Sequence, residues 1–323
     1  MSIRYRSECH LPARPCLRLV CDDPHRPAQR VQARVLGALL QRGSGYGDDG
    51  PSWVEGKQKR PPPRPRDVKL TARKLAKRLR NNAKDDPELL RLAALLRGCQ
   101  RHRRCQHPAC PQCSRALQRL LVQSIYRFLR AYPTLGPWRV LSVIVPATPG
   151  SQTIDFGDRW DEFAALLRQA GLTRGLFGLD LSFNEDDRRA LPASQRFDPY
   201  PCVHLYGLAP AAEVEAAVPV LKQLVPATDA VCRPVRTARF DGDLAAVAYT
   251  FKRNFTRRQT ILKNDRRRAT PVRDTRDRPL TVEQEIRTVR ALDRIGLTGR
   301  IMLLGLSLEA IAPRCSGRCK PRT

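Results

Sequence analysis

The sequence predicts an α+β protein in which an antiparallel sheet carries helices on one face and follows a helical, zinc-binding module. Two observations lead to this prediction. The central part of the chain alternates between β-branched runs and amphipathic patterns in the order strand, helix, strand, strand, helix, strand, helix, which favours a sheet layered against helices. Ahead of it, four cysteines lie within fifteen residues, a density that is typical of a metal site in a reducing compartment.

The charge balance indicates a nucleic-acid partner. The 323 residues hold 59 Lys and Arg against 31 Asp and Glu, a formal net charge of +28, and these charges come in blocks. A field of that sign concentrates phosphate polymers around the protein and releases their counterions on contact. The alternative is a merely soluble, arginine-rich protein from a GC-rich genome.

The chain has no feature of a membrane or secreted protein. No apolar run reaches the roughly 18 residues of a membrane span, and the first residues, MSIRYRSECH, lack a signal-peptide core. Neither a lipidation signal nor a long amphipathic helix is present to hold the chain at a membrane surface. We therefore expect a cytoplasmic protein whose cysteines are reduced.

Composition divides the chain into four predicted regions. Residues 1–66 have little periodicity and end in KQKRPPPRPR, so we expect most of this basic region to be flexible. Residues 67–136 form a helical region with the cysteine cluster, residues 137–256 an α+β domain, and residues 257–323 a basic region with one helix.

Helical spacing predicts three helices in the second region. The first, VKLTARKLAKRLRNNAK, belongs to a strongly basic block at residues 57–84. The second, PELLRLAALLRG, ends at Gly98, and the third runs from about Ser114 to Ala131. Their basic faces either contact DNA or are solvated surfaces over an ordinary core.

The cysteine cluster consists of Cys99, Cys105, Cys110 and Cys113. Cys110-Pro-Gln-Cys113 has the two-residue gap of a zinc knuckle, which lets both thiolates reach one tetrahedral ion. We therefore predict a structural Zn²⁺ held by four thiolates, with His107 as the substitute ligand. Buried or free thiols are the alternative.

After Pro137 the pattern changes to strands and helices. Strands are predicted for WRVLSVIV, GLFGLDLSF, YPCVHLYGL and VCRPVRTARF. Helices are predicted for DRWDEFAALLRQAG, with Asp158 near its N-cap, for AAEVEAAVPVLKQL, and for DLAAVAYTFKRNF, opened by Asp243. Residues 253–278 are expected to form an irregular basic arm, followed by a last helix, VEQEIRTVRALDRIG, and an apolar run, RIMLLGLSLEAI.

Five reactive side chains are expected to meet over one surface of this sheet. Period-two alternation puts Cys202 and His204 on one face of their strand and gives Asp180 a defined face on the preceding strand. Tyr249 and Lys252 are three residues apart on a helix and share a face. Taken singly, such a histidine is ordinarily hydrogen-bonded in a core and such a tyrosine packs a helix.

Three of these segments resemble the motifs of the HUH endonuclease domain of rolling-circle replication initiators of plasmids. LSVIVP resembles the first, hydrophobic motif, YPCVHLYGL the strand bearing His-hydrophobic-His, and AYTFKRNF the helix bearing Tyr-x-x-Lys. The cysteine cluster resembles the CPxC element that precedes the first motif in many of these proteins. The resemblance covers roughly residues 99–255, about half the chain, and depends on the order and spacing of the motifs.

The resemblance implies a DNA-binding replication protein of a plasmid or mobile element that nicks single-stranded or hairpin origin DNA. In that family a metal-polarised phosphate is attacked by tyrosine, leaving a 5′-phosphotyrosine link and a free 3′-hydroxyl. Carried over, Tyr249 is the nucleophile, Lys252 the neighbouring cation, and Asp180, Cys202 and His204 hold Mg²⁺ or Mn²⁺. Host replication proteins are then further expected partners.

The sequence departs from the family at the first histidine of the pair, which is Cys202 here. Thiolate is a poor ligand for magnesium and a good one for zinc, and Asp180 is one methylene shorter than the family's usual glutamate. Two alternatives therefore stand beside the active nuclease: a catalytically inactive relative that binds origin DNA, and an unrelated basic zinc protein that binds RNA and lacks the sheet. If Tyr249 is not the nucleophile, Tyr206 is the next candidate.

Overall fold

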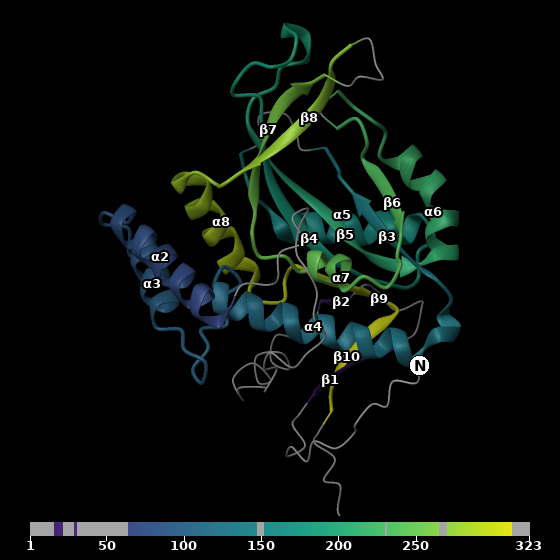
Figure 1. Cartoon of the computed structure of the whole chain (residues 1–323), viewed down its shortest axis with the longest axis horizontal. Coiled ribbons are helices and arrows are strands. Elements are labelled where there is room, and N and C mark those ends of the chain that lie inside the picture. The colour runs from purple at the N-terminus through teal and green to yellow at the C-terminus, as the bar shows by residue number, and fades with distance from the viewer. Residues whose placement is uncertain are drawn as a thin grey trace, which may run out of the picture.

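The structure, a computed structural model, describes residues 16–21, 29–30, 64–146, 152–229, 231–264 and 270–311. Most of the region expected to be flexible, residues 1–66, lies outside this part of the chain. Figure 1 shows a curled sheet with helices packed against it and a helical hairpin at one end of the molecule. The α+β class is confirmed, whereas the sheet is mixed and not antiparallel throughout. No helix of the described ranges is long and apolar enough to cross a membrane.

The three predicted N-terminal helices are present as α2 (Pro65–Asn82), α3 (Pro87–Arg97) and α4 (Pro111–Ala131). Each begins with proline, which costs nothing at the first helical position because that amide has no partner within the helix. The side chain of Asp86 caps α3 by accepting a hydrogen bond from the amide of Leu89 at 3.0 Å. Leucines at helical spacing bury the contact between α2 and α3.

The main sheet is built around three long antiparallel strands. These are β3 (Trp138–Val143), β4 (Gly175–Glu185) and β5 (Tyr200–Pro210), with β6 (Val235–Arg239) beside β3. On the other side of β4 lie β9 (Ile301–Leu304) and β2 (Gln29–Arg30). The register sets Asp180 opposite His204 and Ser182 opposite Cys202. The central strands thus form a sheet. The third interpretation of the sequence, an unrelated basic zinc protein that binds RNA, predicted that this sheet would be absent.

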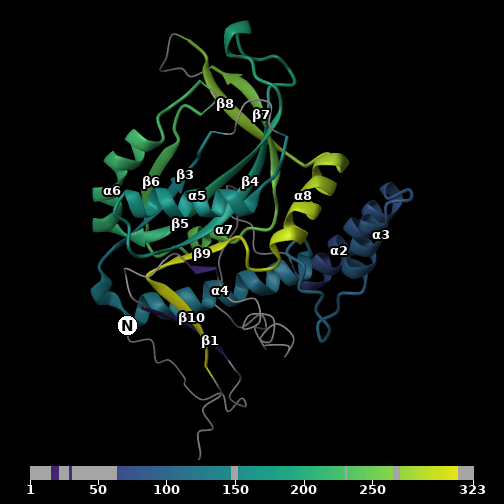
Figure 2. The same ribbon diagram turned by 180° about the vertical axis from the view of Figure 1, so that it is seen from behind.

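Helices cover both faces of this sheet, which corrects the expectation of helices on one face. On one face, α5 (Phe156–Gln169), α6 (Ala211–Leu224) and α8 (Val282–Ile295) pack on alternate strand residues such as Leu179 and Leu205 (Figure 2). On the other face, α4 and the short α7 (Leu244–Thr250) pack on Leu176 and Leu208. The second layer forms because both faces of β4 and β5 are apolar at this end.

Two boundaries differ slightly from the sequence prediction. The N-cap of α5 is Asp155, whose carboxylate accepts from the amide of Asp158 at 3.0 Å, so Asp158 lies inside the first turn. Asp243 caps α7 as predicted, with Oδ1 accepting from the amide of Ala245 at 2.8 Å. That helix ends at Thr250, earlier than its pattern indicated.

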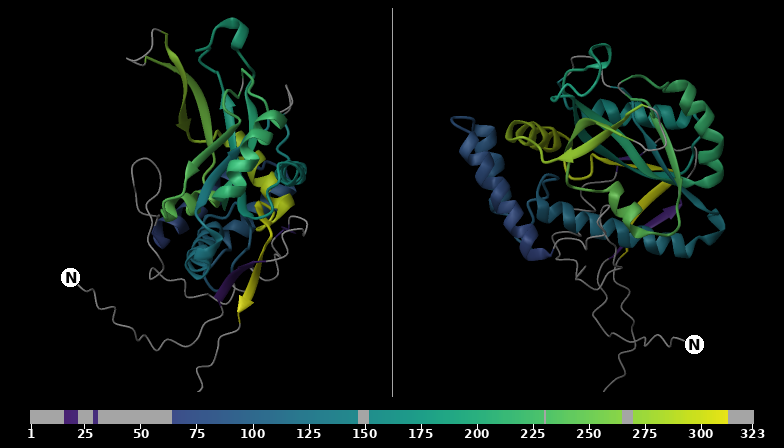
Figure 3. Two further views of the ribbon diagram at one scale, coloured as in Figure 1. Left: turned by 90° about the vertical axis from the view of Figure 1, so that its right-hand side faces the viewer. Right: turned by 45° about the horizontal axis from the view of Figure 1, so that its top comes forward.

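The basic segment at residues 253–278, predicted to be irregular, instead contains a β-ribbon. β7 (Thr256–Lys263) and β8 (Val272–Arg278) are antiparallel, and β7 also pairs in parallel with the end of β4. The many charged and polar residues of these two segments concealed the ribbon, in which one opposite-charge pair, Arg258 with Asp277, lies in register across the strands. In the side view of Figure 3 the ribbon and α7 lie on the same side of the sheet, opposite α5.

The predicted apolar run near the C-terminus folds as two strands. β9 joins the main sheet, and β10 (Leu306–Ile311) pairs with β1 (Cys16–Cys21), a strand from the region expected to be mostly flexible. Gly305 separates the two at a φ of 52°, a left-handed conformation that glycine adopts without a Cβ clash. Leu19 of β1 is buried in the core around α4.

Candidate functional site

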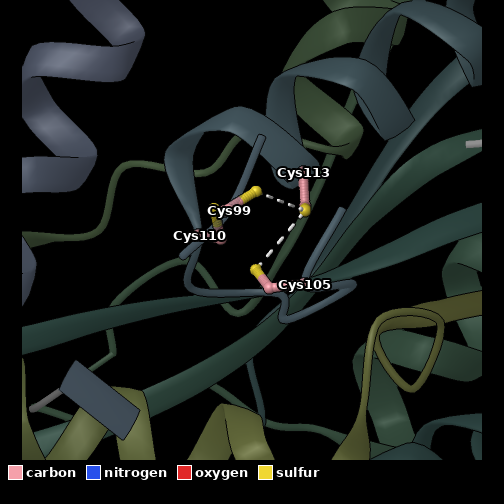
Figure 4. Close-up of side chains that lie close together, drawn as sticks. All are labelled: Cys99, Cys105, Cys110 and Cys113. Carbon is pink, nitrogen blue, oxygen red and sulfur yellow. Dashed lines mark hydrogen bonds between the residues drawn. The ribbon is translucent and has the colours of Figure 1, made fainter. Parts of the chain in front are cut away.

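The four cysteines converge on one point in front of α4 (Figure 4). Their sulfur atoms all lie within 4.8 Å of one another. The Sγ atom of Cys113 is 3.6 Å from those of Cys99 and of Cys105. Cys110 is the residue that caps α4, and Pro111 starts the helix, so the knuckle is fixed at a helix N-terminus.

This arrangement can hold a metal ion such as zinc. A tetrahedral Zn²⁺ with Zn–S bonds of about 2.3 Å has sulfur–sulfur edges of about 3.8 Å, close to the separations found here. His107, the predicted substitute ligand, has a different role. Its Nδ1 accepts from the amide of Ala109 at 3.0 Å, and its Nε2 lies 3.2 Å from Asp293 Oδ1 on α8. His107 is therefore not among the four residues whose ligand atoms lie together.

A second constellation lies where β4, β5 and α7 meet, and we call Asp180, His204, Tyr249 and Lys252 the tyrosine cluster. Asp180 Oδ2 is 3.0 Å from His204 Nε2 and 2.6 Å from Lys252 Nζ. The hydroxyl of Tyr249 donates to the same carboxylate oxygen at 3.4 Å and accepts from Lys252 Nζ at 3.1 Å. Four of the five predicted side chains are thus brought together.

The cluster is a buried ionic network with more positive than negative charge. Burial alone raises the pKa of Asp180, but its pairs with His204 and Lys252 outweigh burial and hold that pKa well below the ordinary value. Burial lowers the pKa of His204, yet the carboxylate of Asp180 raises it overall to about 9. The same carboxylate raises the pKa of Lys252 against its own burial. At neutral pH one carboxylate therefore faces an imidazolium and an ammonium.

The predicted divalent ion does not fit these residues. Both oxygens of Asp180 are engaged, because Oδ1 accepts from the amide of Leu181 at 2.8 Å and Oδ2 is shared by the other three side chains of the cluster. Within the described ranges, only the four cysteines bring three or more ligand atoms within 4.8 Å of one another. Cys202 therefore does not complete a set of metal ligands with Asp180 and His204. The ammonium of Lys252 already neutralises the negative charge of Asp180 that a metal ion would need.

Cys202 is buried beside His204. Its carbonyl oxygen lies 3.4 Å from His204 Nδ1, and its side chain also interacts with that imidazole, so Cys202 flanks His204 without contributing to a set of three clustered ligand atoms. Tyr206, the second candidate nucleophile, packs its ring against Tyr249 at 4.6 Å between centroids. Burial raises the pKa of Tyr206 to about 12, which makes it the weaker candidate.

A groove of about 900 Å³ opens above His204 and Cys202 on the face of the sheet that α7 covers lower down. Its walls come from residues 231–236 and from the β7–β8 ribbon, and its floor from β4 and β5. Five cations line it, against the single acid Asp274: Arg233, Arg236, Arg258, Lys263 and Arg273. The tyrosine cluster thus lies at the boundary between the covered and the open part of this face.

Two features of the site were missed by sequence reasoning. Phe197 lines the groove, with the Arg273 guanidinium 5.1 Å from its ring centroid. Arg300 is buried and donates to the carbonyl oxygens of Leu179 at 2.7 Å and of Lys252 at 3.0 Å, so it links β4 to the end of α7. An arginine at the start of an apolar run was the available signal for Arg300.

Comparisons with models of protein families, with curated proteins and with solved structures found no match to the chain.

Proposed function

We propose that this chain binds nucleic acid, and that it holds single-stranded DNA in the basic groove above β4 and β5. The observation that carries the proposal is the lining of that groove, with five cations against one acid. Cations that line the path of a DNA backbone neutralise its phosphates, and the release of condensed counterions then favours binding. The segment at residues 253–278, predicted to contact phosphates, contributes three of the five: Arg258, Lys263 and Arg273.

The shape and lining of the groove favour a single strand over a duplex. Duplex DNA is read by helices or ribbons that protrude into its grooves, whereas here the charge lines a recess over a sheet. Phe197 offers a ring on which a base can stack, and stacking on an aromatic side chain contributes about 1–3 kcal/mol per base. A paired base in a duplex has no free face for such a contact.

We further propose that Tyr249 is the nucleophile of a strand-cleaving reaction of the rolling-circle type, in agreement with the resemblance of the motifs. The phenol oxygen bonds to phosphorus while the bond from phosphorus to the 3′-oxygen breaks, which yields a 5′-phosphotyrosine and a free 3′-hydroxyl. The phenolic proton passes to water, because the lowered pKa of Asp180 makes its carboxylate a poor base, and the leaving 3′-oxygen takes a proton from the imidazolium of His204.

The positive charge for this step comes from protein side chains in our proposal. Lys252 Nζ, 3.1 Å from the Tyr249 hydroxyl, stabilises the developing phenolate, and His204, the member of the cluster that lines the groove, meets the phosphate that enters from it. The family that the motifs resemble uses a divalent ion for this purpose. The engaged oxygens of Asp180 favour a reaction that proceeds without one.

A second candidate, binding without cleavage, is favoured by one specific observation. Lys252 Nζ is 2.6 Å from Asp180, and the Tyr249 hydroxyl is held by hydrogen bonds with both of these side chains. A structural network of this kind needs no substrate. In this case the groove holds DNA and the cluster only supports its floor.

Binding is tested by fluorescence anisotropy with a labelled single-stranded oligonucleotide, a matched duplex and an RNA of the same sequence. Arg258→Glu is expected to weaken single-strand binding about tenfold or more, while Lys74→Glu, the same charge change on an exposed residue of α2, has a small effect. Equal losses for the two variants would show that binding depends on net charge and not on the groove. Tighter binding of the duplex would contradict a single-stranded ligand.

Cleavage is tested by incubating the full chain with single-stranded DNA labelled at its 3′ end, in EDTA and in Mn²⁺, followed by denaturing electrophoresis. We expect a covalent adduct in both solutions, and none with Tyr249→Phe, which removes one hydroxyl and leaves DNA affinity unchanged. No adduct under either condition selects binding without cleavage. An adduct that needs Mn²⁺ contradicts the metal-free step.

A further inference from the structure

A second recess lies on the helical hairpin formed by α2 and α3, away from the groove above β4 and β5. Its volume is about 590 Å³, and none of its lining residues lines the other groove. Each helix contributes a stripe at spacings of i, i+3, i+4 and i+7: Arg73, Ala76, Lys77 and Arg80 from α2, and Leu90, Ala93, Ala94 and Arg97 from α3. We call this recess the hairpin groove.

Half of this lining is apolar. Ala76 and Ala93 are buried at its floor, Ala94 is exposed, and Leu90 is 43% exposed although it is a large hydrophobic residue. Small side chains at the floor allow the backbone of a third helix to approach closely, and Leu90 offers an apolar contact for it. Matched stripes on two packed helices form the kind of surface in which an amphipathic helix is recognised.

The other half of the lining is cationic, and no acid among the described residues balances its charge. Arg73, Lys77, Arg80 and Arg97 are all exposed, and none of them forms an ion pair with any residue that the structure describes. No acidic residue lines the groove. An occupant with carboxylates at the edges of its apolar face would complement both halves.

Several other charges of the hairpin form ion pairs with α8. Arg78 pairs with Glu285 at 2.9 Å, and Arg91 pairs with Asp293. From α8, Arg290 pairs with Asp86 and, at 3.1 Å, with Glu88. These ion pairs hold one side of the hairpin against α8, which lies beside α2 and α3 in Figure 1. The four cations of the hairpin groove take no part in these ion pairs.

We propose that the hairpin groove is a docking site for an acidic amphipathic helix of a partner protein. Its apolar face lies on Leu90 and the alanines, and its carboxylates pair with the cations at the two edges. Nucleic acid is the less suitable occupant, because phosphates pair with cations but make no use of the apolar floor. This site is independent of the proposed DNA groove and assigns to the basic stretch of α2 a role other than phosphate binding.

The test uses the full chain and a labelled synthetic helical peptide with leucines on one face and glutamates beside them. A peptide of the same composition with its leucines scattered around the helix is the control. The amphipathic peptide is expected to bind at least about tenfold more tightly, because only its leucines reach the groove floor together.

Matched variants locate the binding. Arg80→Glu and Leu90→Glu are each expected to weaken peptide binding about tenfold, whereas Lys74→Glu, an exposed position of α2 outside the groove, changes it less than about twofold. Thermal unfolding of each variant checks that the fold is kept. Equal binding of the two peptides overturns the proposal, as does an equal loss for Lys74→Glu. A loss of duplex DNA binding, with no loss of peptide binding, also overturns it in favour of a nucleic-acid surface.

Discussion

The cysteine cluster takes its four sulfur atoms from one loop and the first turn of α4, whereas the tyrosine cluster takes its side chains from two strands, α7 and the turn that follows it. In the cysteine cluster, four thiols face one another, an arrangement that a dication stabilises once they ionise. In the tyrosine cluster, one carboxylate already faces the cations of His204 and Lys252. A carboxylate in contact with a histidine is therefore not sufficient for a metal site. In the tyrosine cluster the ammonium of Lys252 occupies the position beside Asp180 that a metal ion would need.

The largest effect is expected in the cysteine cluster. Cys113→Ser removes the sulfur that lies 3.6 Å from both Cys99 and Cys105, so the ion loses a central ligand. Because binding of a structural zinc is coupled to folding, we expect loss of the ion and destabilisation by several kcal/mol, on the order of 5. Elemental analysis and urea unfolding measure the two effects. A variant that keeps its metal and its unfolding midpoint would rule out a four-thiolate site.

A smaller loss is expected when the charge balance of the tyrosine cluster is broken. Asp180→Asn keeps the shape of the side chain but leaves the buried cations of His204 and Lys252 without their carboxylate. Breaking a buried ion pair in this way costs about 3 kcal/mol. Urea unfolding measures it, with Ser182→Ala on the same strand face as the control. Equal, small losses would mean that the network adds no stability.

The same network predicts a pH dependence. The pKa of His204 is raised in the folded state to about 9, so its contribution to stability is complete below its ordinary value near 6.5 and is lost as pH rises through 9. At roughly 1.4 kcal/mol per pKa unit, the loss amounts to about 3 kcal/mol. Urea unfolding between these pH values measures it, and His204→Gln is expected to flatten the curve. An equally steep curve in that variant would assign the effect to other groups.

The smallest effect is expected at Cys202, which was predicted as a metal ligand but belongs to no group of three clustered ligand atoms within the described residues. Cys202→Ser places a hydroxyl in a buried position and costs about 1 kcal/mol. The metal content of the chain stays unchanged. The same Cys→Ser change is thus expected to lower the free energy of unfolding strongly at Cys113 and weakly at Cys202. Similar losses of stability at both positions would contradict a metal ion that is held by Cys113 alone of the two.

Local patterns predicted most of the fold. Amphipathic spacing and capping residues indicated α2, α3, α4, α6 and α8, and alternation indicated β3, β4 and β5. The β7–β8 ribbon was missed because its residues are polar on both faces, so that no apolar alternation marks it. Its cross-strand pairs, such as Arg258 with Asp277, exist only once the two segments meet.

The candidate site was predictable to the same degree. Neighbouring strands were enough to bring Asp180 and His204 together. Lys252 was expected on the same helix as Tyr249 but follows the end of α7, and a turn closed by its amide on the Tyr249 carbonyl oxygen at 3.0 Å places it beside that residue. The exact partners of Asp180 were not predictable, because the position of Lys252 depends on how α7 packs on the sheet. Phe197 and the cations of the groove come from segments far apart in the sequence, and only the folded ribbon unites them.

The most direct test of the contrast between the two clusters is the number of metal ions that one chain retains. The full protein is incubated with Zn²⁺ and Mn²⁺, separated from free ions and subjected to elemental analysis, alongside Asp180→Ala and the double variant Cys110→Ser/Cys113→Ser. We predict one zinc and no manganese per chain, with no change in Asp180→Ala and no bound metal in the double variant. A second ion that is lost in Asp180→Ala would show that metal displaces Lys252, and it would contradict our account of the tyrosine cluster.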